Sequence, residues 1–184
     1  MLGIEWLRGN GAIVDYDQQR LGFAGTMEDA KREDTRLVNE GFVAHMMKWD
    51  EKSHRYFVRA EIGGRIARLV VSTVSNNMLD AAFAEKAGLA LGPVVYLDAG
   101  PRGALVPNYL SKQPVMITID GQRTVWAQPI VRDTYAYSSE ARPADNTSDM
   151  NGDLGCDFML ANEAVIDFRS GILFLRRESS AELK

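Results

Sequence analysis

The two ends of the chain carry the same pattern of residues. Residues 2–23 (the N-terminal segment) align without a gap with residues 154–175 (the C-terminal segment), at a constant offset of 152 residues. Self-similarity of this length predicts an internal duplication; a generic strand-turn-helix unit used twice is the alternative. Identical or similar pairs include Leu2/Leu154, Gly3/Gly155, Trp6/Phe158, Asn10/Asn162, Ala12/Ala164, Val14/Ile166, Asp15/Asp167, Tyr16/Phe168 and Leu21/Leu173.

Both segments predict the same local structure. A Leu-Gly strand end comes first, then Glu5 or Asp157 opens a short helix, and a β hairpin follows around Asp-Tyr or Asp-Phe. The glycine allows the backbone to pass close to a neighbouring strand, and the acidic residue is favourable at a helix N-terminus. We therefore expect one strand-helix-hairpin unit at each end of the chain.

A candidate site lies in the stretch Arg68–Asn77, which reads R-L-V-V-S-T-V-S-N-N. Three apolar residues run directly into a small polar loop, and a helical pattern is predicted at Asn77–Gly88. A hydrophobic strand that stops at a Ser/Thr/Asn loop holds polar side chains at the rim of a core. Chemistry is often placed at such a rim.

This loop resembles the active-site loop of retropepsin-like aspartic proteases. In that family a strand rich in Val and Leu leads to Asp-Thr-Gly-Ala-Ser. The family also closes with Leu-Gly-x-Asp-Phe-Leu, a short helix and a Val-Ile-Asp-Phe strand, which resembles the C-terminal segment. The resemblance implies a mainly β fold, a closed β-barrel lobe with one or two short helices, to which the N-terminal duplicated segment is added. The positions that match the active-site loop are Ser72, Thr73, Val74, Ser75 and Asn76.

The same resemblance sets the expected domain organisation. The first segment is then the tail of a preceding copy whose front half is missing, truncated or supplied elsewhere, or it packs as an extra layer on the complete copy. Thr26 with Asp29 predicts the start of a linker helix. The expected divisions are residues 1–24 as the duplicated closing segment, 25–40 as the linker helix, 41–176 as the retropepsin-like domain and 177–184 as a polar tail.

Two further stretches predict β structure in the domain. The apolar run Val94–Leu97 ends at Asp98-Ala99-Gly100, which superficially resembles an aspartic-protease triplet. Pro101 and Arg102 follow it in place of small residues, so we expect the flap hairpin of the family there, with a mobile turn. Residues 114–132 predict a hairpin around Asp120-Gly121, and residues 134–151 a long polar loop.

The loop lacks the groups that aspartic proteolysis needs. That reaction uses two carboxylates that share a proton, and single-lobe members supply one from each subunit of a dimer. Ser72 stands at the position of the aspartate, and a hydroxyl has no charged form near neutral pH. Val74 replaces the glycine of the tight turn. We therefore expect no catalytic residue at Ser72, Thr73 or Val74, and an architectural role for Thr73.

Two functions follow. The first is a catalytically inactive module that binds a protein or an extended peptide, or serves as a structural subunit, as a homodimer or in a larger assembly. The second is an aspartic endopeptidase whose catalytic aspartates come from a preceding repeat or a partner chain. The predicted partner cleft comprises Ser72, Thr73, Ser75, Asn76, Asp98, Gly100 and Arg102.

Composition excludes several other classes. The net charge is −4 and the pI about 5.3, so nucleic-acid binding is not expected. Cys156 is the single cysteine, and with only two histidines the chain predicts no disulfide, no metal site and no cofactor. No apolar run approaches the roughly 20 residues of a membrane helix. We expect a soluble chain in a reducing compartment, such as the cytoplasm or an organelle interior.

Overall fold

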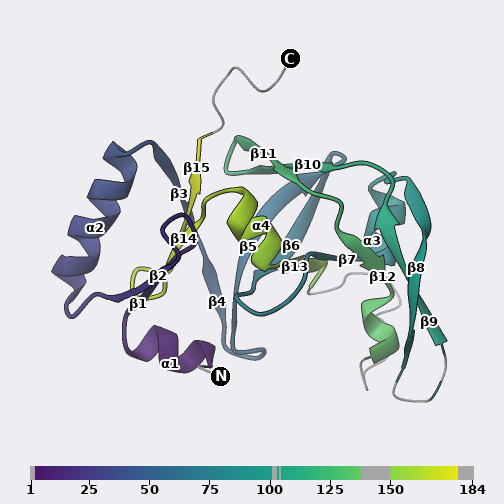
Figure 1. Cartoon of the computed structure of the whole chain (residues 1–184), viewed down its shortest axis with the longest axis horizontal. Helices are drawn as coiled ribbons and strands as arrows, with labels where there is room; N and C mark the ends of the chain where they lie inside the picture. Colours follow the sequence, from purple (N-terminus) through teal and green to yellow (C-terminus); the bar gives the residue numbers. More distant parts are fainter. Residues whose placement is uncertain (1–2, 101–102, 104, 138–149, 178–184) are drawn as a thin grey trace. The chain divides into compact units, whose positions relative to one another are not determined.

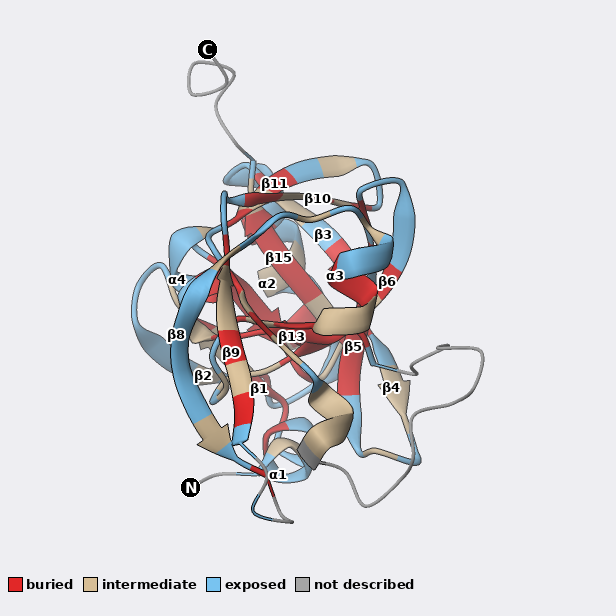
Figure 2. Cartoon of the chain, turned by 90° about the vertical axis from the view of Figure 1, so that its right-hand side faces the viewer, coloured by how far each residue is buried: buried red, intermediate tan, exposed pale blue. Residues whose placement is uncertain are grey.

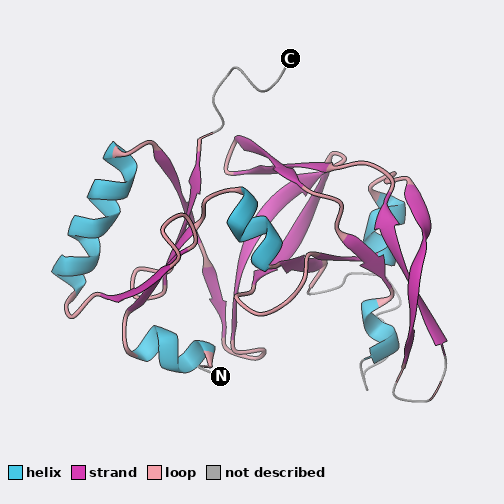
Figure 3. Ribbon diagram, in the orientation of Figure 1, coloured by secondary structure: helices cyan, strands magenta, loops and turns pink. Residues whose placement is uncertain are grey.

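The computed structural model describes residues 3–100, 103, 105–137 and 150–177 (Figure 1). The chain divides into two compact units, one formed by Met1–Val58 with Met159–Lys184 and one by Arg59–Phe158. Strands predominate over short helices (Figure 3), which confirms the predicted mainly β fold. The predicted residues Pro101 and Arg102, the loop 138–149 and residues 178–184 lie outside the described residues.

The first unit is built on a five-stranded antiparallel sheet in the order β2-β1-β14-β15-β3. Leu37, Phe42, Val165 and Phe174 form a buried cluster on it. β5 (Arg55–Ile62) and α4 (Cys156–Ala161) begin in one unit and end in the other. The other elements of this unit are α1 (Ile4–Gly9), β1 (Ala12–Asp15), β2 (Arg20–Phe23), α2 (Met27–Asn39), β3 (Phe42–Met46), β4 (Lys48–Asp50), β14 (Val165–Asp167) and β15 (Ile172–Arg176).

The predicted helix at residues 25–40 is confirmed as α2. Its N-terminus is a capping box: the Asp29 amide donates to Thr26 Oγ1 at 3.1 Å, and the Thr26 amide donates to Asp29 Oδ2 at 3.0 Å. Leu37 is 1% exposed and belongs to the core cluster. The helix therefore contributes to packing besides connecting two segments.

The central strand pair of this sheet joins the two aligned segments. β1 and β14 are antiparallel, and Val14 lies opposite Ile166, its own equivalent at the offset of the alignment. The Tyr16 amide donates to Ala164 O at 2.9 Å, and the equivalent Phe168 amide donates to Ala12 O at 3.0 Å. The two strands are thus related by a local two-fold axis.

The backbone of the two segments also matches residue by residue. α1 and α4 each span six residues at the same offset. Left-handed backbone occurs at equivalent positions: φ is 62° at Gly11 and 48° at Glu163, and 51° at Gln19 and 69° at Gly171. The helix and hairpin predicted for each segment are both present.

The second unit contains most of a second sheet, in the order β11-β10-β5-β6-β13-β7-β12-β9-β8, with β4 paired to β5. This order runs from one edge strand to another, and the described strands do not close into a ring. Trp126, Ile117 and Leu69 are among its fully buried residues. Its elements are β6 (Arg65–Val71), β7 (Met78–Asp80), α3 (Ala81–Lys86), β8 (Leu91–Ala99), β9 (Leu105–Ser111), β10 (Val115–Ile119), β11 (Gln122–Trp126), β12 (Ile130–Arg132), η1 (Thr134–Tyr137) and β13 (Gly152–Leu154).

The hairpin predicted at residues 114–132 is confirmed as β10 and β11. Asp120 and Gly121 both have positive φ, 47° and 85°. Two successive residues in this conformation form the type I′ turn, whose twist matches that of the flanking strands. The Asp-Gly pair therefore fixes the register of the hairpin.

The helix predicted at Asn77–Gly88 begins later in the structure than in the prediction. Met78–Asp80 forms β7, which pairs in parallel with β12, and α3 begins only at Ala81. Asp80 marks the change, because its Oδ2 accepts a hydrogen bond from the Phe83 amide at 3.2 Å. Pairing with a strand about 50 residues away overrides the local helical pattern.

Candidate functional site

The polar loop 72–77 follows β6 and folds back on its own first residue. The Ser72 amide donates to Leu154 O at 3.0 Å. Ser72 Oγ accepts hydrogen bonds from the Ser75 amide at 3.1 Å and, more weakly, from the Val74 amide at 3.5 Å. Within the described part of the chain these amides are the hydrogen-bond partners of the hydroxyl, so no base is positioned to activate it.

The start of α4 passes directly beside this loop. A Cβ atom on Gly155 would lie 2.2 Å from Ser75 O, so only glycine fits there. The Asn77 side chain, 6% exposed, accepts hydrogen bonds through Oδ1 from the Gly155 amide at 3.0 Å and the Phe158 amide at 3.3 Å. The Cys156 thiol donates to Thr73 O at 2.9 Å. The Leu-Gly element therefore holds the loop in place.

A cavity of about 270 Å³ adjoins the loop. Arg132, at the end of β12, and Asp153, in β13 and 8% exposed, bring opposite charges to its wall. Ser75 also lines this wall, and its Oγ is buried with no hydrogen-bond partner in the described structure. The lining residues are Val74, Ser75, Asn76, Met78, Tyr96, Ile130, Arg132 and Asp153.

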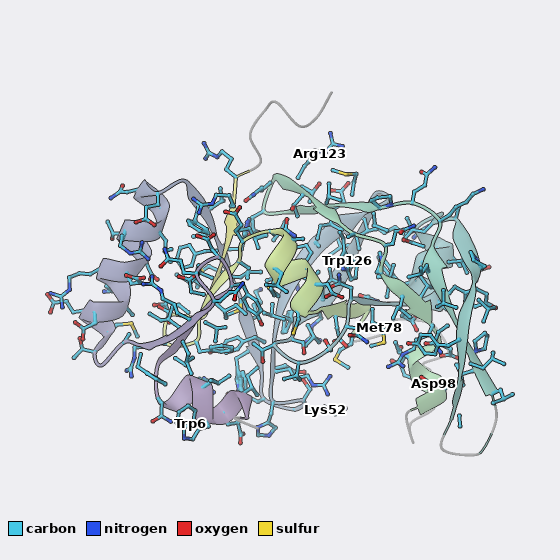
Figure 4. All side chains as sticks on the ribbon, viewed as in Figure 1. Trp6, Lys52, Met78, Asp98, Arg123 and Trp126 are labelled. Atoms are coloured by element: carbon cyan, nitrogen blue, oxygen red, sulfur yellow. The ribbon has the colours of Figure 1, made fainter. Side chains whose placement is uncertain are left out.

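β8 contributes Tyr96 to the wall of the cavity, and Asp98 lies near the site. Asp98 Oδ2 lies 3.5 Å from Arg132 Nη1. Figure 4 labels Asp98 and also Met78, which lines the cavity. β8 is the last strand in the order of its sheet, and Figure 2 shows it mainly exposed. Its apolar side chains at Val94–Leu97 are between 41% and 55% exposed. An exposed apolar edge of this kind can accept another strand.

The structure brings together only part of the predicted cleft. Ser75 and Asn76 line the cavity. Asp98 does not line it but pairs with Arg132, which does. Ser72 and Thr73 lie in the loop but do not line the cavity. Gly100 accepts a hydrogen bond from the Gly103 amide at 2.8 Å. Arg102 lies outside the described residues.

The sequence prediction lacked five of the lining residues: Met78, Tyr96, Ile130, Arg132 and Asp153. Asp153 carried a usable signal, since it is a charged residue two positions before Gly155, the glycine of the closing element. Its place beside the loop depends on β13 pairing with β6 on one side and β7 on the other. Arg132 carried no such signal, because β12 reaches the site by pairing with β7 and β9, which are distant in sequence.

The described residues contain neither a metal-binding group nor a membrane-spanning helix. No group of three or more His, Cys, Asp and Glu side chains in them is arranged to hold a metal ion. None of their helices combines the length and the apolar character needed to cross a membrane.

Comparison with known proteins finds similar solved structures but no matching sequence. No protein-family profile matches the sequence, and no curated protein sequence matches it. Solved retropepsin-like proteases are similar to this chain. At 12% to 16% identity this likeness assigns no role to any residue of this chain, and the description of the site rests on the geometry above.

Three of these structures illustrate the likeness. The retroviral protease-like domain of Ddi1 from Leishmania major is 12% identical, with a TM-score of 0.39, and the match covers 71% of this chain and 98% of that one. The EIAV protease in complex with the inhibitor HBY-793 is 16% identical, with a TM-score of 0.39 and coverage of 62% and 93%. A retropepsin-like aspartic protease from Rickettsia conorii is 14% identical, with a TM-score of 0.39 and coverage of 73% and 93%.

Proposed function

We propose that this chain is a non-catalytic retropepsin-like module that binds an extended protein segment at the cavity beside the loop 72–77. The hydroxyl of Ser72 carries this proposal. It stands at the position of the family's catalytic aspartate and accepts hydrogen bonds from the amides of its own turn. Without a carboxylate there, the proton-sharing pair of aspartic proteolysis cannot form.

The cavity and the β8 edge support binding of a peptide in extended form. An edge strand offers backbone hydrogen bonds that are independent of the partner's sequence. The adjoining cavity then selects side chains, since Arg132 and Asp153 bring a cation and a carboxylate to its wall. A polar side chain of the bound segment fits this chemistry best.

The test measures binding and cleavage by the full chain. The probe is a reduced, carboxymethylated protein labelled with a fluorophore, titrated with the chain by fluorescence anisotropy at pH 7. We expect saturable binding that Arg132→Ala weakens by about tenfold, because a charged hydrogen-bonding group is lost. Arg123→Ala is the matched control, since Arg123 is exposed on β11, at the opposite end of the strand order from β8.

The cleavage assay separates this proposal from the endopeptidase alternative. The same substrate, incubated with the chain between pH 4 and pH 7, should stay intact for the unmodified protein. Cleavage that a transition-state mimic of aspartic proteolysis blocks would overturn the proposal, as would the absence of binding. Ser72→Asp with Val74→Gly serves as the comparison variant, because it restores the family residues in the loop.

A further inference from the structure

The two aligned segments share a backbone but differ in how far their apolar side chains are covered. Each has an aromatic residue on its helix and two apolar residues on its second strand. In the N-terminal segment these side chains are exposed, and Trp6 packs edge-on against Phe23 with ring centroids 5.9 Å apart. Figure 4 shows Trp6 projecting from α1. The exposed fractions are 43% at Trp6, 46% at Leu21 and 53% at Phe23, against 0% at the equivalent Phe158, Leu173 and Leu175.

The glycine of each segment shows the same difference. Gly155 is crowded by the loop 72–77, where a Cβ atom would meet Ser75 O at 2.2 Å. At Gly3, its equivalent, a Cβ atom would meet no described atom within 4 Å. The N-terminal segment thus has a glycine suited to close approach of another backbone, but the described chain places no backbone beside it.

The outer strands complete the comparison. β15 has β3 on its far side, with Leu173 opposite His45 and Leu175 opposite Val43. β2, its equivalent, is the last strand in the order of the same sheet, and no described strand pairs with its outer edge. The Ala24 amide donates to Gly11 O at 2.8 Å, so by the alternation of an antiparallel ladder the peptide groups of Leu21 and Phe23 face outward.

There is also room beside β2. A groove of about 660 Å³ lies between the β1–β2 hairpin and α2. Four of its charged side chains form two ion pairs: Arg20 lies 3.0 Å from Asp15, and Arg36 lies 2.6 Å from Glu33. Because these charges already have partners, apolar contacts and backbone hydrogen bonds are what this region offers to an occupant.

We propose that the face formed by Gly3, Trp6, Leu21 and Phe23 is the docking surface for a second lobe of the same fold. That lobe supplies an antiparallel strand to the outer edge of β2, as β3 does for β15, and a polar loop against Gly3, as the loop 72–77 does for Gly155. The occupant is defined by the C-terminal segment, where the equivalent side chains and the equivalent strand edge are covered in this way. This inference is independent of the cavity in the second unit, so either can fail alone.

Amide hydrogen exchange tests the open edge in the full chain. At a concentration where the protein is monomeric, the amides of Gly22 and Ala24 should be protected, and those of Leu21 and Phe23 should exchange at nearly the unfolded rate. Slow exchange of Leu21 and Phe23 in the monomer would show that the edge is already occupied and overturns the proposal. Protection that disappears on dilution assigns the edge to a second copy of this chain. The β3 strand of such a copy is already paired with its own β15 and cannot be the added strand, so this outcome also overturns the proposal.

A tethered strand then tests the mode of docking. The probe is a second copy of residues 41–48, the β3 sequence with one flanking residue before and two after, joined to the N-terminus of the full chain by a flexible Gly/Ser linker of about 15 residues. We expect exchange of the Leu21 and Phe23 amides to slow by about tenfold or more. Replacing the residues that correspond to Val43 and His45 in the added copy by proline removes the donors and should abolish the effect. If the fusion without the proline substitutions leaves exchange of the Leu21 and Phe23 amides unchanged, the proposal is overturned.

Discussion

The two aligned segments form the same hairpin turn, but the side chains beside their turn aspartates carry opposite charges. In each hairpin an aspartate accepts a hydrogen bond from the amide three residues later, at 2.9 Å for Asp15 and 3.1 Å for Asp167. Asp15 lies beside the guanidinium of Arg20, whereas Asp167 lies beside the carboxyl group of Asp34. Both segments thus share the hydrogen bond from the turn amide to the aspartate. They differ in whether a cation or a carboxyl group lies beside that aspartate.

The largest expected contrast is between the two helix aromatics. Phe158→Ala removes a fully buried ring and should lower the free energy of unfolding by about 3–5 kcal/mol. Trp6→Ala removes a ring that is 43% exposed and should lower it by about 1 kcal/mol. Urea denaturation followed by circular dichroism measures both. Equal losses would mean that the N-terminal segment is covered as fully as the C-terminal one.

The two glycines should differ next. Gly155→Ala forces a Cβ atom against the backbone of the loop 72–77 and should destabilise the protein by about 2–3 kcal/mol. Gly3→Ala enters open space and should change the stability by less than about 0.5 kcal/mol. Thermal denaturation of the two variants in one buffer tests the pair. A large loss for Gly3→Ala would contradict the open surface beside α1.

The smallest contrast concerns the aspartates and depends on pH. Burial and the neighbouring Asp167 carboxylate raise the pKa of Asp34 to about 6. The folded state therefore holds this proton more tightly than the unfolded state, so stability is lost as the pH rises from about 4 through 6. Asp34→Asn should stabilise the protein by about 1 kcal/mol at pH 7.5, after allowance for partial exposure, and by nothing near pH 3.5.

The matched control for that variant is Asp15→Asn. Asp15 is 4% exposed and its partner is the Arg20 cation, so the substitution should destabilise the protein at pH 7.5. Opposite signs for the two substitutions, measured by urea denaturation at the two pH values, would confirm that the neighbours of Asp15 and of its equivalent Asp167 set the electrostatics. The same sign for both would contradict the comparison.

Local signals in the sequence predicted the elements that depend on local interactions. Thr26 with Asp29 predicted the start of α2, and Asp120-Gly121 predicted the β10–β11 turn. The strand β7 was missed because its residues follow a helical pattern and become a strand only through pairing with β12 and β13. For the same reason the sequence placed Ser75 and Asn76 at the site but missed Arg132 and Asp153.

The pairing of β1 with β14 also bears on how the chain folds. These two central strands come from opposite ends of the polypeptide, with Ile13 opposite Asp167. During synthesis, α2 and β3 emerge long before β14 and β15 exist, so the first unit completes its sheet only after nearly the whole chain has left the ribosome. Contacts this distant in sequence slow folding and prolong the exposure of unpaired strand edges to aggregation.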